Sequence, residues 1–374
     1  MVEWKKLGEV CASLTKSIIK QGDLVDDGAY PVINSGVSLY GRLNDFNNEG
    51  NAFTLASRGE YAGYISYLSE RFWAGGLCYP YRSQNEEILN TKFAYQYLKK
   101  KERYIMDTLV MRGGIPALNK ADVDKMLIPI PSLSEQARIV EQLDMFTMAI
   151  GSLKEQLELR RKQYEYYRDQ LLDLEGKEGV EMKTIGDLFV FKNGLNKEKQ
   201  YFGQGNPIVN YTDVYHNIKI TKGLLKGKVE LSDSEIDRYR VHKGDVFFTR
   251  TSETKEEVGY AAVMLEEVDN CTFSGFLLRA RPTTTLLMPD YCAYCFGSYQ
   301  VRQEIIKSST LTTRALTNGG VLSKISFPVP ALSEQQRIVS ILDTFEASIR
   351  NLEEQIKERE KQYEYYRNQL LTFE

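Results

Sequence analysis

The chain has 374 residues, of which 42% are hydrophobic and 26% are charged, and its formal net charge at pH 7 is −3. A chain of this length and composition is typical of a globular protein with two domains that each bury a core. No apolar run is long enough to cross a bilayer, and the first residues lack the apolar region of a signal peptide, so we expect a cytoplasmic protein. The small negative net charge neither requires nor excludes a nucleic-acid partner.

Cysteine and histidine give no sign of a metal or redox site. The five cysteines are an odd number without a framework spacing, so we expect no disulfides. Cys292 and Cys295 form a C-x-x-C pair, but no second pair follows, and the flanking residues fit an amphipathic helix whose packing explains both. The two histidines, His216 and His242, have no neighbours at metal-ligand spacing. We therefore expect no metal ligands and no catalytic residues in this chain.

Residues 1–132 are predicted to form a first globular domain, because short apolar runs alternate with turn residues. Residues 53–68 contain two strand-like segments that flank a turn with Arg58 and Gly59. Residues 91–101 place Phe93 and Leu98 on one face, which predicts a helix. The mixture of strands and helix indicates an α+β domain.

Residues 133–176 predict one long helix that packs lengthwise on another helix. Once Arg160 and Tyr167 are counted in the register, apolar residues recur at spacings of four and three over about five to six heptads. The members of this seam are Ile139, Leu143, Phe146, Ile150, Leu153, Leu157, Tyr164, Leu171 and Leu174. Ser134 is placed to cap the first turn. A helix of roughly 42 residues is about 63 Å long, so we interpret it as a spacer.

Residues 177–331 are predicted to form a second globular domain on the same plan. The segment EMKTIGDL from Glu181 corresponds to EWKKLGEV from Glu3, and residues 244–264 correspond to residues 51–68. This alignment matches the Gly-Tyr pairs of the two hairpins and places Arg250 opposite Arg58. One helix is expected to carry Tyr294, Phe296, Val301 and Ile305.

Residues 332–374 repeat the first spacer without a gap, at a constant offset of 199 residues such as that from Gln163 to Gln362. A repeat of this length indicates a duplicated domain with its helix. The seam recurs at Ile338, Leu342, Phe345, Ile349, Leu352, Ile356, Tyr363, Tyr366, Leu370 and Phe373. Ser333 and Gln336 have the spacing of a capping box. We expect the two helices to pack on each other antiparallel, although the seam also permits parallel packing. Both helical segments carry net negative charge, and the domains are slightly basic.

One motif occurs twice, each time where a globular domain ends and a long helix begins. It reads IPIPSLSEQARIV from Ile128 and FPVPALSEQQRIV from Phe327, accompanied by RGGIPALNKADVDKMLIPIP, by GDLFVFKNGLNKEK from Gly186 and by two copies of KQYEYYR. With these motifs the whole chain resembles the specificity subunit of type I restriction-modification systems. The implied fold is α+β, with two target recognition domains joined by two long antiparallel spacer helices in a pseudo-two-fold internal repeat. In one departure, TRALTNGGVLSKISFPVP lacks the I-P-x-L-N-K form of the first copy.

The resemblance implies a non-catalytic subunit in which each domain reads one half of a bipartite site on double-stranded DNA. The helices would set the gap between the halves and dock two modification subunits, which methylate adenine. Restriction subunits would add the motor and the nuclease. No cofactor is expected on this chain, because S-adenosylmethionine, ATP and Mg would be held by the partner subunits.

We expect DNA contacts at the hairpin turns and at the approach to each helix, where Arg can pair with guanine and Ser, Thr and Asn can serve bases or phosphates. The candidates in the first domain are Asn34, Ser35, Ser57, Arg58, Tyr61, Arg112 and Lys120. Those in the second are Lys192, Asn193, Arg250, Thr251, Ser252, Lys255 and Arg314. For each of them, an ordinary solvated surface residue is the alternative.

The tyrosines of KQYEYYR are more numerous than one seam can bury, so some are expected to face a partner. They are Tyr164, Tyr166, Tyr167, Tyr363, Tyr365 and Tyr366. Packing between the two spacers is the alternative for this set.

The sequence carries no Asn-Pro-Pro-aromatic or Asp-Pro-Pro-aromatic tetrapeptide, no G-x-G-x-x-G and no phosphate-binding G-x-x-x-x-G-K-[ST]. This pattern favours a binding module over an enzyme. Two rival hypotheses remain: a two-module scaffold that binds peptide or carbohydrate ligands, and a self-sufficient enzyme. Salt-dependent DNA binding would argue against the first, and inactivity of the isolated chain would argue against the second.

Overall fold

The computed structural model describes residues 2–373, which form two compact units. The first unit contains Met1–Glu155 with Glu353–Glu374, and the second contains Gln156–Leu352. Each unit is an α+β domain with one segment of each long helix, α4 (Leu133–Leu172) and α11 (Leu332–Leu370). None of the helices within residues 2–373 is long and apolar enough to span a membrane. The domain boundaries given by the sequence stay predictions.

The first unit is built on a four-stranded antiparallel sheet with the strand order β2-β8-β5-β6. These strands are β2 (Cys11–Ser13), β5 (Ala52–Ala56), β6 (Ile65–Leu68) and β8 (Cys78–Ser83). All five residues of β5 are buried. Since successive side chains point to opposite faces of a strand, both faces of β5 must be covered. Phe53 and Leu55 pack with the buried face of helix α2 (Thr91–Tyr104), while Ala52 packs on the opposite side with Ile33. The helix predicted for residues 91–101 is thereby confirmed.

Smaller elements surround this sheet. The strands are β1 (Glu3–Lys6), β3 (Tyr30–Ile33), β4 (Gly41–Leu43), β7 (Trp73–Ala74), β9 (Val110–Met111), β10 (Ala117–Leu118) and β11 (Leu127–Ile130). The short helices are α1 (Leu7–Val10), α3 (Lys120–Asp124), η1 (Gln21–Asp23) and η2 (Ile105–Leu109). β1 pairs antiparallel with β11, so the start and the end of the domain lie on one ribbon that leads into α4.

The second unit repeats this plan, with one additional strand in its main sheet. Its main sheet has the order β13-β21-β17-β19-β15, formed by β13 (Phe189–Asn193), β15 (Lys219–Ile220), β17 (Val246–Thr249), β19 (Ala261–Met264) and β21 (Leu277–Pro282). The other strands are β12 (Val180–Thr184), β14 (Phe202–Val209), β16 (Lys228–Val229), β18 (Thr251–Ser252), β20 (Thr272–Phe273), β22 (Thr310–Leu311), β23 (Ala315–Leu316) and β24 (Ser326–Pro330). The shorter helices are α5 (Ile185–Leu188), α6 (Tyr211–His216), α7 (Asp233–Tyr239), α8 (Pro289–Phe296), α9 (Tyr299–Ser308), α10 (Gly319–Leu322), η3 (Lys199–Tyr201) and η4 (Lys222–Leu224). The extra strand β15 and helix α6 belong to an insertion between β14 and β16.

The helix predicted to carry Tyr294, Phe296, Val301 and Ile305 is in fact two helices, α8 and α9. The chain turns at Gly297, whose N–H donates to Tyr294 O at 3.1 Å, and at Ser298, whose hydroxyl donates to Cys295 O at 2.7 Å. The prediction of one continuous helix is therefore wrong. A Ser hydroxyl that bonds a nearby carbonyl competes with the backbone hydrogen bonds of a helix, which helps to end α8 here.

Matched backbone hydrogen bonds give the true correspondence between the two domains. Ala56 N–H donates to Tyr64 O at 2.8 Å in the first, and Thr249 N–H donates to Tyr260 O at 2.9 Å in the second. The residue that follows in each, Ser57 or Arg250, therefore takes the same place. The predicted match of Arg58 with Arg250 is wrong by one residue, because the two loops differ in length and the alignment followed residue type.

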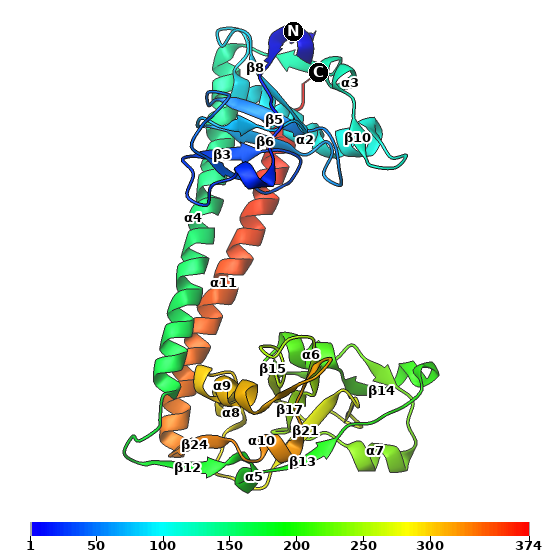
Figure 1. Cartoon of the computed structure of the whole chain (residues 1–374), viewed down its shortest axis with the longest axis vertical. Coiled ribbons are helices and arrows are strands. Elements are labelled where there is room, and N and C mark those ends of the chain that lie inside the picture. Colours follow the sequence, from blue (N-terminus) through cyan, green and yellow to red (C-terminus); the bar gives the residue numbers. More distant parts are fainter. Residues whose placement is uncertain (1, 374) are drawn as a thin grey trace. The chain divides into compact units, whose positions relative to one another are not determined.

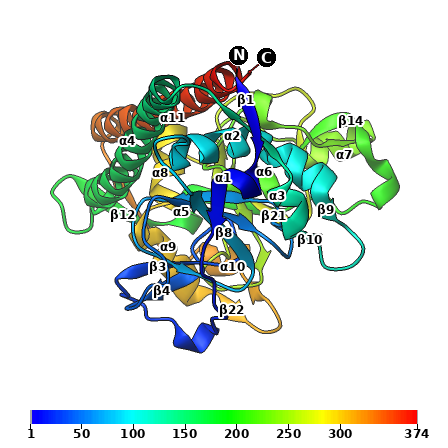
Figure 2. The same ribbon diagram turned by 90° about the horizontal axis from the view of Figure 1, so that it is seen from above.

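The long helices run antiparallel within each unit and lie side by side (Figures 1 and 2). In the first unit Phe146 stacks on Tyr366, with ring centroids 5.3 Å apart. In the second, Tyr167 stacks on Phe345 at 5.5 Å. The offset of 199 residues converts one pair into the other, so both units use the same contact. The antiparallel expectation is confirmed, and the parallel alternative is excluded.

The helix caps differ from those predicted. α4 begins at Leu133, and the hydroxyl of Ser132 accepts the N–H of Glu135 at 3.3 Å. α11 begins at Leu332, so Ser333 lies inside its first turn and Gln336 bonds Ser340 instead. Both helices start two residues earlier than a cap at Ser134 or Ser333 would give, although both start at the first residue of the predicted segments 133–176 and 332–374.

A buried glutamine joins each domain to its long helix. Gln136 is fully buried: its Oε1 accepts the N–H of Asn90 at 2.8 Å, and its Nε2 donates to Ile88 O and Pro131 O, both at 2.9 Å. Gln335 repeats these bonds in the second unit with Met288, Leu286 and Pro330, at 2.8, 2.7 and 2.9 Å. In each domain the amide thus binds the start of the first long domain helix, α2 or α8.

Replacing Gln136 with leucine should destabilise the first unit, because it leaves one buried N–H and two carbonyls without partners. We expect the free energy of unfolding to fall by about 2–4 kcal/mol. Both tryptophans, Trp4 and Trp73, belong to this unit, so urea unfolding followed by tryptophan fluorescence reports on it. Gln142→Leu, at an exposed position of the same helix, should change the value by less than about 0.5 kcal/mol. Equal unfolding midpoints for the two variants would contradict this role of Gln136.

Candidate functional site

The loop after β5 presents two of the predicted DNA-contact side chains to solvent. Arg58 and Tyr61 are exposed. Ser57 is buried, and its backbone holds the loop in place: its N–H donates to Leu77 O at 2.8 Å and its carbonyl accepts the N–H of Leu118 at 2.9 Å. Of these three residues, Arg58 and Tyr61 are the ones whose side chains can reach a ligand in this conformation.

The remaining candidates of the first domain are Asn34, Ser35, Arg112 and Lys120. Asn34 is buried, and its Oδ1 accepts the N–H of Leu77 at 2.9 Å, so its side chain supports the turn at Leu77. Lys120 pairs with Asp124 at 2.7 Å, and Arg112 is exposed and donates to Met106 O at 3.3 Å. Ser35 is half-buried. Their contact with DNA stays a prediction.

In the second domain the candidates Arg250, Thr251, Ser252 and Lys255 share one loop. Arg250 is half-buried, and its guanidinium donates to Gly275 O at 3.1 Å. Ser252 is buried and donates to Glu257 at 3.0 Å, while Thr251 and Lys255 are half-buried. Arg250 is therefore held against a neighbouring turn, while Thr251 and Lys255 are more accessible than Ser252.

The candidates Lys192, Asn193 and Arg314 lie outside this loop. Arg314 is exposed and faces Glu253 at 3.7 Å, and Asn193 is exposed at the end of β13. Lys192 donates to Arg238 O. Burial, together with the charges of Arg279, Arg238 and Arg281, lowers its pKa.

The environment of Lys192 is a basic cluster that the sequence analysis did not single out. Arg279 and Arg281 lie on the strand β21 that pairs with β13, and both guanidinium groups approach the buried carboxylate of Asp245, at 4.0 and 2.7 Å. Burial lowers the pKa of Arg279. Arg279 and Arg281 are two residues apart on one strand, so both side chains lie on the same face. This spacing is the feature of the sequence that could have identified the cluster.

The KQYEYYR tyrosines divide into three pairs related by the repeat. Tyr164 and Tyr363 are half-buried, and Tyr363 donates to Gln96 Oε1 at 3.0 Å. Tyr167 and Tyr366 make the inter-helix stacks already described. Tyr166 and Tyr365 are 59% and 57% exposed, which makes them the members best placed to meet a partner.

Next to Tyr365 the helix pair of the first unit forms a groove of about 950 Å³. Its lining combines apolar side chains with long polar ones; they include Arg138, Met145, Phe146, Arg359, Tyr365 and Tyr366. Met145 is largely exposed, as is Met148 one turn further along α4. An apolar groove with a polar rim between two helices has the chemistry to accept another helix.

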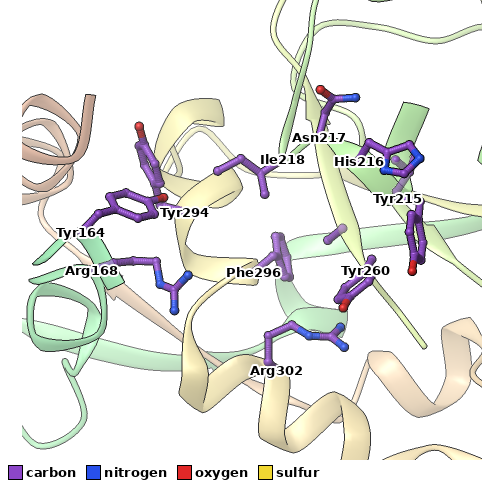
Figure 3. Close-up of a pocket in the computed structure, with 13 residues that line it drawn as sticks. Tyr164, Arg168, Tyr215, His216, Asn217, Ile218, Tyr260, Tyr294, Phe296 and Arg302 are labelled. Atoms are coloured by element: carbon purple, nitrogen blue, oxygen red, sulfur yellow. The ribbon is translucent and has the colours of Figure 1, made fainter. Parts of the chain in front are cut away.

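A cavity of about 240 Å³ lies in the second unit between α4, the insertion and helices α8 and α9. Figure 3 shows Tyr164 and Tyr294 on one side, Tyr215 and Tyr260 on the other and Phe296 between them. Arg302 lies below Phe296 and Tyr260 in this view, held by hydrogen bonds to Gly259 O and Glu256 O, both at 2.8 Å.

One difference between the domains lies in the lining of this cavity. Gly297 takes the place that Lys99 occupies in the first domain, since Met288 and Asn90 receive the same glutamine bond. Lys99 fills its place by donating to Ile65 O at 2.9 Å and by pairing with Glu102 at 2.5 Å. Gly297 has no side chain to occupy the corresponding space, and it lines the cavity together with residues of the insertion.

The insertion is anchored to α11 by a lysine. Lys219 Nζ lies 2.6 Å from Asp343, 3.2 Å from Glu346 and 2.6 Å from the Tyr294 hydroxyl. Burial alone would raise the pKa of Asp343, but hydrogen bonds from Lys219 and Tyr294 outweigh it and bring the pKa below the usual 3.8. The fold therefore stabilises the charged form of the Asp343 carboxylate.

The chemistry of the cysteines is that of packed core residues. Cys292 and Cys295 are buried in α8, and burial raises the pKa of Cys295 to about 12. Among residues 2–373, no group of three or more His, Cys, Asp or Glu side chains is arranged to hold a metal ion. The C-x-x-C pair is accounted for by helix packing.

Comparison with known proteins gives matches along the whole chain. A family model described as the type I restriction modification DNA specificity domain matches residues 1–160 and 177–361. The type I restriction enzyme EcoR124I/EcoR124II specificity subunit of Escherichia coli is 26% identical over 410 aligned positions, which cover 100% of this chain and 94% of that relative.

Two solved structures share the fold. The S subunit of a type I restriction-modification system from M. genitalium has a TM-score of 0.62 at 16% identity, covering 100% of this chain and 97% of that one. A chain from a structure on complex assembly and conformational transition of the type I R-M system has a TM-score of 0.64 at 18% identity, covering 99% and 97%. These matches confirm the resemblance drawn from the sequence motifs.

The Asp343 contact predicts a pH dependence of stability. Because its pKa is lower in the folded state, the carboxylate stabilises the fold above the usual pKa of 3.8, and this stabilisation is lost as pH falls through the folded value. Asp343→Asn should therefore be less stable than the unmodified protein at neutral pH, and the difference in unfolding free energy should shrink below about pH 4. Urea titrations at several pH values measure this difference in unfolding free energy. In the Lys219→Met background the same substitution should matter less, and an equal, pH-independent loss in both backgrounds would refute the assignment.

Proposed function

Because the chain belongs to the type I restriction-modification DNA specificity family, we propose that each of its domains reads one half of a bipartite target on double-stranded DNA. The observation that carries this proposal is the combination of a repeated scaffold with unlike loops. The two domains share their strand order and the glutamine joint, yet the loops after β5 and β17 differ in length and charge. Two readers of different half-sites require this arrangement.

Base reading would come from the exposed part of each loop. Arg58 in the first domain and Thr251 and Lys255 in the second lie beside backbone that is fixed by β10 and β23. A side chain that projects from a fixed backbone loses less freedom on binding than one on a mobile loop. The neighbouring lysines and arginines would contribute phosphate contacts, which position the protein without reading bases.

The paired helices would set the gap between the half-sites and dock two modification subunits. Support comes from the exposed pair Tyr166 and Tyr365 and from the apolar groove beside Tyr365. Repetition at an offset of 199 residues offers the same helix surface twice, which suits two copies of one partner.

The chain itself would be non-catalytic and would direct the chemistry of other subunits. It lacks the Asn-Pro-Pro-aromatic and Asp-Pro-Pro-aromatic motifs of amino methylation. S-adenosylmethionine would be bound by the modification subunits, and ATP and Mg would be used by the motor and nuclease subunits of the restriction complex.

Mapping methylated adenines tests the proposal. The chain is expressed with its neighbouring modification subunit in a methylation-deficient host, and modified adenines are located across the genome. We expect one split motif with a constant gap. Arg58→Ala should relax only one half of it, because loss of one base contact costs about 1–3 kcal/mol. An assembled complex that leaves no methylated motif would refute DNA specificity.

Docking is tested separately. Combined replacement of Tyr166 and Tyr365 with alanine should abolish co-purification with the modification subunit, because it removes the most exposed aromatic side chain from both copies. The matched control replaces the preceding residues, Glu165 and Glu364, with alanine and should leave the complex intact. Circular dichroism should show unchanged helix content in both variants. Retained assembly in the tyrosine variant would rule out this surface.

A further inference from the structure

Each domain has a tight turn with an exposed apolar residue at the same place. In the first domain it is Leu77, and in the second it is Phe276. The carbonyl of Leu77 accepts the N–H of Ser57 at 2.8 Å, and the carbonyl of Phe276 accepts the N–H of Arg250 at 3.2 Å. Because Ser57 and Arg250 occupy corresponding positions, the two apolar residues correspond as well.

The backbone that precedes these residues is held in the same way in both domains. Gly75 N–H donates to Ile33 O at 2.7 Å, and Ser274 N–H donates to Val209 O at 3.0 Å. One glycine follows in each, Gly76 or Gly275. Both turns therefore lie against the strand that bears the recognition loop, and their position is fixed by backbone bonds that do not involve the apolar side chain.

The side chains themselves are directed to solvent. Leu77 is 40% exposed and Phe276 is 69% exposed. Within residues 2–373 neither belongs to a buried hydrophobic cluster. Neither side chain fills a core, so both are free to contact a ligand, and the two domains carry them at the same place.

A cation lies at the same carbonyl in both turns. Lys16 Nζ donates to Gly76 O at 3.1 Å, and the Arg250 guanidinium donates to Gly275 O at 3.1 Å. Lys16 and Arg250 come from different parts of the scaffold, since Arg250 corresponds to Ser57. Two unrelated positions thus supply one arrangement, in which a cation binds the carbonyl of the residue before the apolar one.

An apolar tip next to a cation fits duplex DNA better than it fits an apolar protein surface. Phosphates flank every base step, so a side chain that enters between bases meets negative charge on either side. Proteins that insert leucine or phenylalanine between base pairs unstack the step and bend the duplex. A cation beside a purely apolar protein partner would instead be left without a counter-charge.

We propose that Leu77 and Phe276 are apolar wedges that press into the base stack, one in each half of the target, while Lys16 and Arg250 neutralise the adjacent phosphates. This inference rests on the proposed DNA-reading function. It adds a mode of reading in which each domain selects steps that are easily unstacked, beyond the bases that its polar side chains contact. Since phenylalanine is the larger wedge and the more exposed, it distorts its half-site more than leucine does.

The test uses the assembled complex of specificity and modification subunits with duplexes that carry 2-aminopurine at successive positions of the mapped target. The unmodified complex should raise the probe fluorescence at one step in each half, because unstacking relieves quenching. Phe276→Ala should remove the rise in one half, and Leu77→Ala in the other, each with an affinity loss of about tenfold. Leu77→Phe keeps an apolar wedge and should retain or increase the signal. Lys16→Ala should instead lower the salt dependence of binding.

The matched control is another exposed apolar pair related by the repeat, Ile88 and Leu286, which are 45% and 46% exposed. Alanine at these positions should leave both probe signals and the affinity unchanged. If the unmodified complex binds its target and the Leu77→Ala and Phe276→Ala complexes give the same probe signals as the unmodified complex, the wedge inference fails and the DNA-reading function stands. If the unmodified complex binds no DNA, both fail.

Discussion

The hydrogen bonds of two buried glutamine side chains are the constraint on which the rest of this structure depends. Each amide uses its oxygen and both protons of its nitrogen, and it joins the start of a long helix to the segment that enters a domain helix. Glutamate at Gln136 or Gln335 would lose the two donated bonds, and asparagine is one methylene shorter. Because the joint is made within the motif that opens each spacer, the orientation of a domain on its helix is independent of the loops that the domain carries.

This independence explains how one scaffold supports two dissimilar domains. The second domain inserts α6 and β15 at the edge of its sheet and secures them to α11 through Lys219, which adds a strand without disturbing the shared ones. The helix that is continuous through Lys99 in the first domain is interrupted at Gly297 in the second, where a cavity lies beside it, yet the core on the other side of that helix is retained in both domains. Changes of this kind accumulate at sheet edges and loops because backbone pairing there is least constrained.

The sequence predicted most of what is repeated and little of what is local. A seven-residue seam and an exact offset between copies were enough to identify the helices and their pairing, since hydrophobic periodicity directly reflects burial. The capping positions were misjudged by two residues because each helix begins at the leucine that precedes the predicted capping serine, and sequence pattern locates helix ends poorly. The match of Arg58 with Arg250 failed because register between strands is set by hydrogen bonds across the sheet, which residue type does not encode.

The candidate site was predicted least well, for a physical reason that Asn34 and Phe276 illustrate. A polar residue near a recognition loop can either contact the ligand or support the loop. Asn34 does the second, because it is buried and its amide oxygen accepts the N–H of Leu77, which satisfies the need of a buried polar group for a hydrogen bond. An apolar residue near such a loop is interpreted from sequence as core, whereas Phe276 stands in solvent because its turn is fixed by backbone bonds and by Arg250, without the phenylalanine side chain. Polarity therefore does not distinguish the residues that hold a recognition surface from those that use it. Comparison of the two domains does distinguish them. A contact that supports the scaffold recurs with corresponding partners, as the glutamine joint does, while the cation at each apolar turn comes from a different segment of the chain in each domain.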